Sequence, residues 1–159
     1  MSFKLFLESE EEFDQRIDSW RNFRPTMHAI SPSMITKNAV DDVISVLAGS
    51  KPAATVHISI LNNDPDKDLI YDRIRKIGYT KQQFPDGIVV FGPRDLVHNI
   101  SDEMKLRNTA KRANDGTILN IGYHTRMGKY LGYPEDIVDS FVQRLQQKYH
   151  DEFSLDLPG

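Results

Sequence analysis

The segment 117–149 restricts the fold of this chain more than any other part of it, because every local signal within it agrees. Its first residues, 117–121, form an apolar run typical of a buried strand, and residues 124–131 then repeat apolar side chains at helical spacing. Gly132 suits a helix C-terminus, where a positive φ is common, and Pro134 suits the first residue of a new helix. The segment therefore predicts a strand, a short helix, a corner and a long amphipathic helix that packs across the sheet.

The rest of the chain alternates between strand and helix signals, which favours the α/β class, with an α+β arrangement as the alternative. We expect a single-layer mixed β-sheet packed against several amphipathic helices, in one globular domain that spans residues 1–159. The expected strands are 3–7, 27–30, 55–61, 79–84 and 88–91, with 153–157 as an edge strand or a loosely docked tail; the expected helices are 9–24, 35–47, 69–77 and 101–112.

The composition excludes several classes of site. The 159 residues include no cysteine, which rules out disulfides, zinc–thiolate sites, iron–sulfur clusters and a cysteine nucleophile. No apolar run approaches the ~20 residues of a membrane helix, and the N-terminus turns acidic after a few apolar residues, unlike a signal peptide. We therefore expect a soluble cytoplasmic protein with no membrane partner and no cofactor, and leave a homo-oligomer open.

Charge is distributed unevenly along the chain. The net charge of −3 disfavours general nucleic-acid binding, yet the segment 105–129 holds six Lys or Arg residues and one acid, Asp115. This leaves 14 of the 20 cations and 22 of the 23 acids in the rest of the chain. Because the local field attracts a small ion, the segment predicts a site for an anionic ligand, either phosphorylated or nucleotide-like. The alternative is a solvated helix that simply carries helix-forming Lys and Arg.

The candidate ligand-binding residues are Arg112, Thr125, Arg126 and Lys129. Residues 125–129 follow the end of the expected strand and open the next helix. Backbone N–H groups and cationic side chains in such a place together bind a phosphate or carboxylate. The alternative is that these residues only cap and solubilise the start of the helix.

A second hypothesis is catalytic and rests on His57-Ile58-Ser59. On a strand, positions 57 and 59 face the same side, so an imidazole and a hydroxyl would meet there and exchange a proton. This fragment resembles one half of the duplicated His-x-Ser/Thr pattern of the two-histidine phosphoesterases, and the resemblance implies cleavage of a phosphodiester without a metal. The second copy is missing, because His124-Thr125 lacks the intervening residue. His57, Ser59 and His124 are the candidate catalytic residues.

We consider the acidic residues for a metal site and for contact with another protein. Asp64, Asp66 and Asp68 alternate as in a calcium loop, but the glycine and glutamate of such a loop are absent, so we expect no metal site. The acidic N-terminal helix and the C-terminal tail instead offer surfaces for contact with another protein. A non-catalytic interaction or regulatory protein is therefore the third hypothesis.

Overall fold

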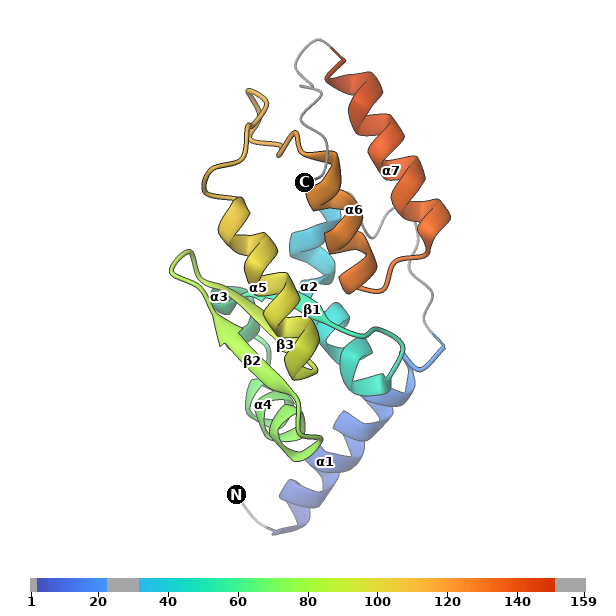
Figure 1. The fold of residues 1–159 in the computed structure, drawn as a ribbon. Coiled ribbons are helices and arrows are strands. Elements are labelled where there is room, and N and C mark those ends of the chain that lie inside the picture. The colour runs from blue at the N-terminus through green and yellow to red at the C-terminus, as the bar shows by residue number, and fades with distance from the viewer. Residues whose placement is uncertain (1–2, 23–31, 151–159) are drawn as a thin grey trace.

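The computed structural model describes residues 3–22 and 32–150, and in this part of the chain it has seven helices and three strands. Figure 1 shows the strands near the centre of the molecule, α1 at its lower end, and α6 and α7 side by side at its upper end. The elements are α1 (Phe3–Asp18), α2 (Pro32–Ala48), β1 (Ala54–His57), α3 (Ile58–Asn62), α4 (Lys67–Lys76), β2 (Thr80–Gln83), β3 (Ile88–Gly92), α5 (Arg94–Leu106), α6 (Ile121–Tyr130) and α7 (Glu135–Lys148). The expected strands at 27–30 and 153–157 lie outside the described residues.

The sheet has three strands in the order β1-β3-β2. β3 is the central strand, and it runs antiparallel to β1 and to β2. The expected α/β character is confirmed, and so is the hairpin around Pro85-Asp86-Gly87. The expectation of a mixed sheet is wrong, because both pairings are antiparallel.

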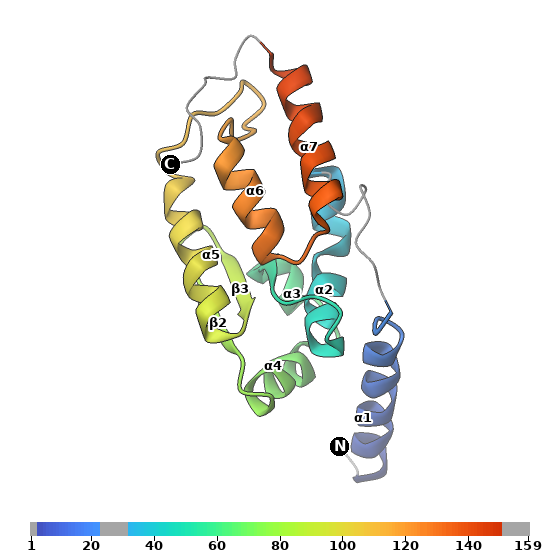
Figure 2. The same cartoon turned by 45° about the vertical axis from the view of Figure 1, so that its right-hand side comes forward.

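Helices cover both faces of this sheet. Val89 and Phe91 of β3 pack in one apolar cluster with α2 and α4, whereas Val90 packs in a second cluster with α5 and α6. Figure 2 shows α5 on one side of the strands and α2 and α3 on the other. A strand that is buried on both faces has a continuous apolar sequence, which explains the run Ile88–Phe91.

The expected strand at 55–61 is only half a strand. β1 ends at His57, which pairs with Ile88, the first residue of β3. The β2–β3 hairpin turns away beyond that pair, so Ser59 has no partner strand. Residues 58–62 instead form the short helix α3. His57 and Ser59 therefore do not share a strand face.

Two other sequence-based assignments are wrong. Residues 3–7 belong to α1, so Ser9 and Glu12 lie within that helix and do not form a capping box at its start. Residues 117–121 form a single β-bridge, between Ile118 and Arg112, and α6 begins at Ile121. Ile118 is nonetheless buried, so the apolar run marks a loop that is packed under helices. The helix expected at 101–112 is α5, which begins and ends several residues earlier.

α7 has the expected extent, but it packs on α6 and not across the sheet. Val138 and Val142 of α7 form an apolar cluster with Tyr133, and Leu131 packs against it. An apolar stripe at helical spacing identifies the buried face of a helix but not the element that covers it.

Among the described residues, no helix has both the length and the apolar surface that crossing a lipid bilayer requires.

The corner between α6 and α7 is fixed against the segment that precedes β1. Gly132 has a φ of 83°, as its position predicts, and a Cβ there would lie 2.2 Å from Pro52 Cδ. Next to it the ammonium group of Lys51 is buried, 3.4 Å from Tyr133 Oη and 3.5 Å from Asp42 Oδ1. Burial lowers the pKa of Lys51, although the carboxylate of Asp42 opposes this effect. These contacts hold the α6–α7 unit in one place relative to the sheet.

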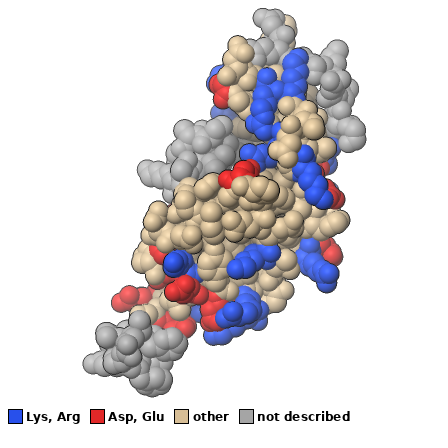
Figure 3. Space-filling model, turned by 90° about the vertical axis from the view of Figure 1, so that its left-hand side faces the viewer, with Lys and Arg blue, Asp and Glu red and all other residues tan. Residues whose placement is uncertain are grey.

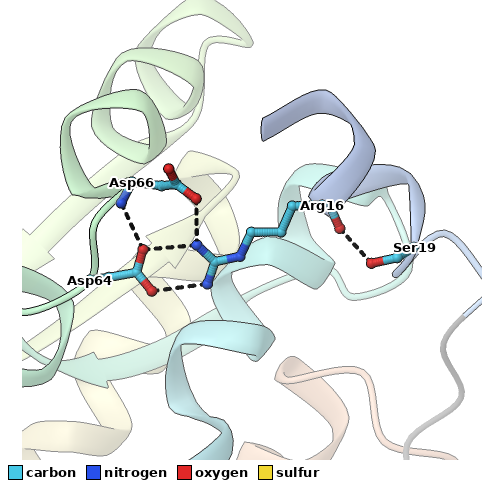
Figure 4. Close-up of polar contacts among 4 residues, drawn as sticks. All are labelled: Arg16, Ser19, Asp64 and Asp66. Atoms are coloured by element: carbon cyan, nitrogen blue, oxygen red, sulfur yellow. Dashed lines mark hydrogen bonds and ion pairs between the residues drawn. The ribbon is translucent and has the colours of Figure 1, made fainter. Parts of the chain in front are cut away.

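α1 is attached to the body by charged contacts (Figure 4). Arg16 Nη1 donates to Asp64 Oδ1 at 2.8 Å and to Asp66 Oδ2 at 2.7 Å, while Nη2 donates to Asp64 Oδ2 at 2.9 Å. These bonds lower the pKa of Asp64 below its usual value. Asp64 and Asp66 therefore dock a helix and do not form a metal loop.

Candidate functional site

A cavity of about 450 Å³ lies between the sheet, α5, α6, α7 and the loop that connects α5 to α6. Its volume is within the range of small-molecule sites, roughly 300–1,000 Å³. Most of its wall is apolar, and the principal apolar side chains are Ile88, Met104, Met127, Leu131, Val138 and Phe141. These side chains come from β3, α5, α6, the corner after α6, and α7.

Two arginines line this cavity, the half-buried Arg107 and the exposed Arg112. Arg112 Nη1 donates to Gly116 O at 2.9 Å and Nη2 donates to Arg107 O at 2.8 Å. These bonds close the loop on itself and use two of the five N–H donors of the guanidinium group. Arg107 Nη1 lies 3.4 Å from Asp86 Oδ2 at the hairpin turn. The loop therefore holds two guanidinium groups at one wall of the cavity.

Asp115, an acid at the rim of the cavity, is engaged by the protein itself. Tyr149 Oη donates to its Oδ2, Thr117 N donates to its Oδ1 at 3.0 Å, and Lys148 Nζ lies 3.9 Å away. These partners lower the pKa of Asp115 to about 2. The contact with Tyr149 also joins the end of α7 to the cavity rim.

His124 lines the cavity from α6, and its ring is held by surrounding groups. Its Nε2 lies 2.6 Å from Ile118 O, an atom that can only accept, so the proton is on Nε2. The ring meets Tyr123 and Phe141 edge to face, with centroids 5.2 Å and 5.5 Å away. Burial lowers its pKa, which keeps the imidazole neutral. His124 thus fastens α6 to the loop and to α7.

The structure separates the ligand-binding residues that the sequence suggested. Arg112 lines the cavity, whereas Thr125 and Lys129 lie on α6, outside the cavity lining. Arg126 pairs with Glu103 of α5, whose side chain is only 8% exposed. Arg107 belongs to the basic segment but was not among the predicted site residues, because only the folded loop shows which of those cations line the cavity.

His57 and Ser59 meet through a different geometry from the expected one. His57 caps α3, and its Nδ1 lies 2.7 Å from Ser59 Oγ and accepts from Ser59 N at 3.2 Å. Its Nε2 lies 3.1 Å from Asp86 O. A backbone N–H only donates and a carbonyl only accepts, so Nδ1 is unprotonated and Nε2 carries the proton. A Cβ at Gly87 would lie 2.5 Å from His57 Nε2, so the hairpin turn closely confines the ring.

His124 does not complete this pair as a second catalytic histidine. It lies on α6, its Nε2 is bonded to Ile118 O, and it lines the cavity, while His57 lies at the end of β1. The two-histidine pattern requires both residues on opposing strands. The resemblance to that family therefore extends only to His57 and Ser59.

Within residues 3–22 and 32–150, no group of three or more His, Asp or Glu side chains is placed to hold a metal ion. In comparisons with known proteins, no family model, curated protein or solved structure matches the chain.

Proposed function

We propose that this protein binds a small anionic molecule in the cavity beside α6. The observation that carries the proposal is the position of Arg107 and Arg112 at one wall of an otherwise mainly apolar space. A guanidinium group binds carboxylate and phosphate through paired N–H donors, and such bonds are strong where apolar side chains exclude water.

The charge of the surrounding surface supports this proposal. Figure 3 shows Lys and Arg side chains crowded at the upper end of the face that carries α5, with few Asp and Glu among them. At the lower end of that face, toward α1, acidic and basic side chains are mixed. A positive field on this face raises the local concentration of an anion even though the net charge of the chain is −3.

Calorimetric titration with octyl phosphate tests the proposal. Replacing Arg107 or Arg112 with glutamine is expected to weaken binding about 10-fold to 100-fold, the effect of losing a hydrogen bond to a charged group. Arg75→Gln is the matched control, because Arg75 is an exposed arginine of α4, paired with Asp72 away from the cavity. Equal affinity in the Arg107, Arg112 and Arg75 variants would refute the proposed site.

A second candidate function is hydrolysis of a phosphodiester without a metal at Ser59. The contact of 2.7 Å between Ser59 Oγ and His57 Nδ1 favours it, because an unprotonated Nδ1 is a proton acceptor. In this reaction Ser59 Oγ attacks phosphorus and its proton passes to Nδ1. The leaving alcohol then takes that proton. Water, deprotonated in turn at Nδ1, attacks phosphorus and breaks its bond to Ser59 Oγ; the phosphomonoester leaves and the proton on Nδ1 returns to Ser59 Oγ. Asp86 O keeps the Nε2 proton in place and so holds the ring in the required tautomer.

Turnover of bis(4-nitrophenyl) phosphate in the presence of a chelator tests this second candidate. His57→Gln and Ser59→Ala are each expected to lower kcat by at least about 100-fold, the usual contribution of a general base. His98→Gln is the control, because His98 is an exposed histidine of α5 that lies near Asp102. Full activity in the His57 and Ser59 variants, or turnover that the chelator abolishes, would exclude this mechanism.

A further inference from the structure

We infer that the ligand of this cavity is an amphiphile, a molecule with one anionic head group and an apolar tail. The inference rests on the proposed function, because it assigns the head group to Arg107 and Arg112. It adds the chemistry of the rest of the ligand and the direction in which the ligand lies.

The two arginines and part of the apolar lining occupy opposite ends of α6. Arg107 and Arg112 belong to the loop that leads into the N-terminus of α6, whereas Leu131 and Val138 belong to the corner that follows its C-terminus and to the first turns of α7. α6 runs from Ile121 to Tyr130, so these ends are about 15 Å apart at 1.5 Å per residue. Figure 2 shows the loop at the upper end of α6 and the corner at the lower end. The cavity therefore suits a molecule that lies along α6 with its charge at the N-terminal end.

The apolar lining offers adaptable contacts along the length of the cavity. Met104 and Met127 face the cavity from α5 and α6, and unbranched methionine side chains adjust to tails of differing shape. Phe141 adds an aromatic surface from α7. A tail that is buried among these side chains gains free energy in proportion to the apolar area that leaves water.

A nucleotide fits the same lining poorly. Its sugar and base need several hydrogen-bond partners, yet polar groups of the wall are already engaged. His124 Nε2 donates to Ile118 O, and Asp115 accepts from Tyr149 and Thr117. Buried sugar hydroxyls or base nitrogens without partners would weaken binding. The lining thus favours an apolar tail over the nucleotide-like ligand that the sequence suggested.

Titration with inorganic phosphate, butyl phosphate and octyl phosphate tests the inference. Burial of each methylene is expected to tighten binding up to about fourfold, so octyl phosphate binds on the order of 100-fold more tightly than butyl phosphate. Leu131→Trp narrows the end of the cavity beyond the C-terminus of α6 and should reduce this gain while leaving butyl phosphate binding nearly unchanged. Tyr79→Trp is the control, because Tyr79 packs in the cluster on the opposite face of the sheet.

The outcomes separate the two claims. If all three phosphates bind equally and Arg107→Gln weakens each of them, the amphiphile inference is overturned and the anion site remains. If octanol binds as tightly as octyl phosphate and the arginine variants change neither affinity, the anion site itself is refuted and the inference falls with it. Absence of binding by all of these compounds refutes both.

Discussion

Arg126 of α6 forms an ion pair with Glu103 of α5, a carboxylate that is buried between the two helices. Arg126 Nη2 donates to Glu103 Oε2 at 3.2 Å, and Nε donates to Oε1. The pair joins α6 to the helix that lies on the sheet, so the cation that sequence analysis assigned to a ligand stabilises the fold. The cationic wall of the cavity comes from Arg107 and Arg112.

Arg126→Gln is expected to lower the free energy of unfolding by about 2–3 kcal/mol, because it leaves the Glu103 carboxylate buried without its charge partner. Octyl phosphate affinity should stay within about twofold of the wild type once the protein is folded. Lys129→Gln, on an exposed position of the same helix, is the control and should change neither quantity. Urea unfolding and calorimetry measure the two effects, and an Arg126→Gln variant that is stable but no longer binds would contradict this role for Arg126.

Gly132→Ala is expected to destabilise the protein more than Gly49→Ala does. Both glycines have a φ near 80°, which costs an alanine about 1–2 kcal/mol. Only at Gly132 does the added methyl group also meet an atom, Pro52 Cδ at 2.2 Å, whereas nothing lies within 4 Å at Gly49. Thermal unfolding of the two variants gives the comparison, and equal losses would show that the corner does not press on Pro52.

Stability should depend on pH through His124. Burial lowers its pKa in the folded protein below the value of 6.5 expected for the unfolded chain, so the unfolded state binds more protons as the pH falls. The free energy of unfolding should therefore decrease as the pH is lowered through about 6.5. His124→Gln, which keeps an N–H donor for Ile118 O, should remove part of this decrease, while His98→Gln should leave it intact. Identical pH profiles for wild type and His124→Gln would contradict the buried neutral imidazole.

Arg16→Gln is expected to loosen α1 from the body. The side chain is partly exposed, so we expect a loss of about 1 kcal/mol in global stability. The local effect on α1 should exceed this global effect. Relative to the wild type, amide exchange in the Arg16→Gln variant should accelerate more in α1 than in α2. Asp64 has a lowered pKa in the folded state, so this contribution is present above about pH 4 and is lost as the pH falls below that value. Arg21→Gln, in an exposed pair with Asp18, is the control, and equal exchange rates in both variants would refute the anchor.

Much of the fold could be predicted from local sequence signals. The helix that ends before Gly49, the helix that ends before Gly78, the β2–β3 hairpin and α7 were all predicted from apolar spacing and turn residues, and the structure confirms them. Local signals failed where the partner of a segment decides its structure. The run 117–121 is apolar because it is buried, and 58–61 leaves the sheet because β3 begins opposite His57 and offers no partner beyond it.

The candidate site was only partly predictable for the same reason. The excess of cations in 105–129 is visible in the sequence, but the charge partner of each cation is not. Glu103 lies just outside that segment and engages Arg126, while the folded loop makes Arg107 and Arg112 part of the cavity lining. His57 and Ser59 do lie in contact, but through a helix cap and not through a shared strand face.

The most direct test of the central claim is nuclear magnetic resonance of the ¹⁵N- and methyl-labelled protein during titration with octyl phosphate. The account predicts that the largest shifts occur at the Nε–H signals of Arg107 and Arg112 and at the methyl groups of Met104 and Met127. Shifts confined to Thr125, Arg126 and Lys129, which lie on α6 outside the cavity lining, or no shifts at saturating ligand, would contradict it.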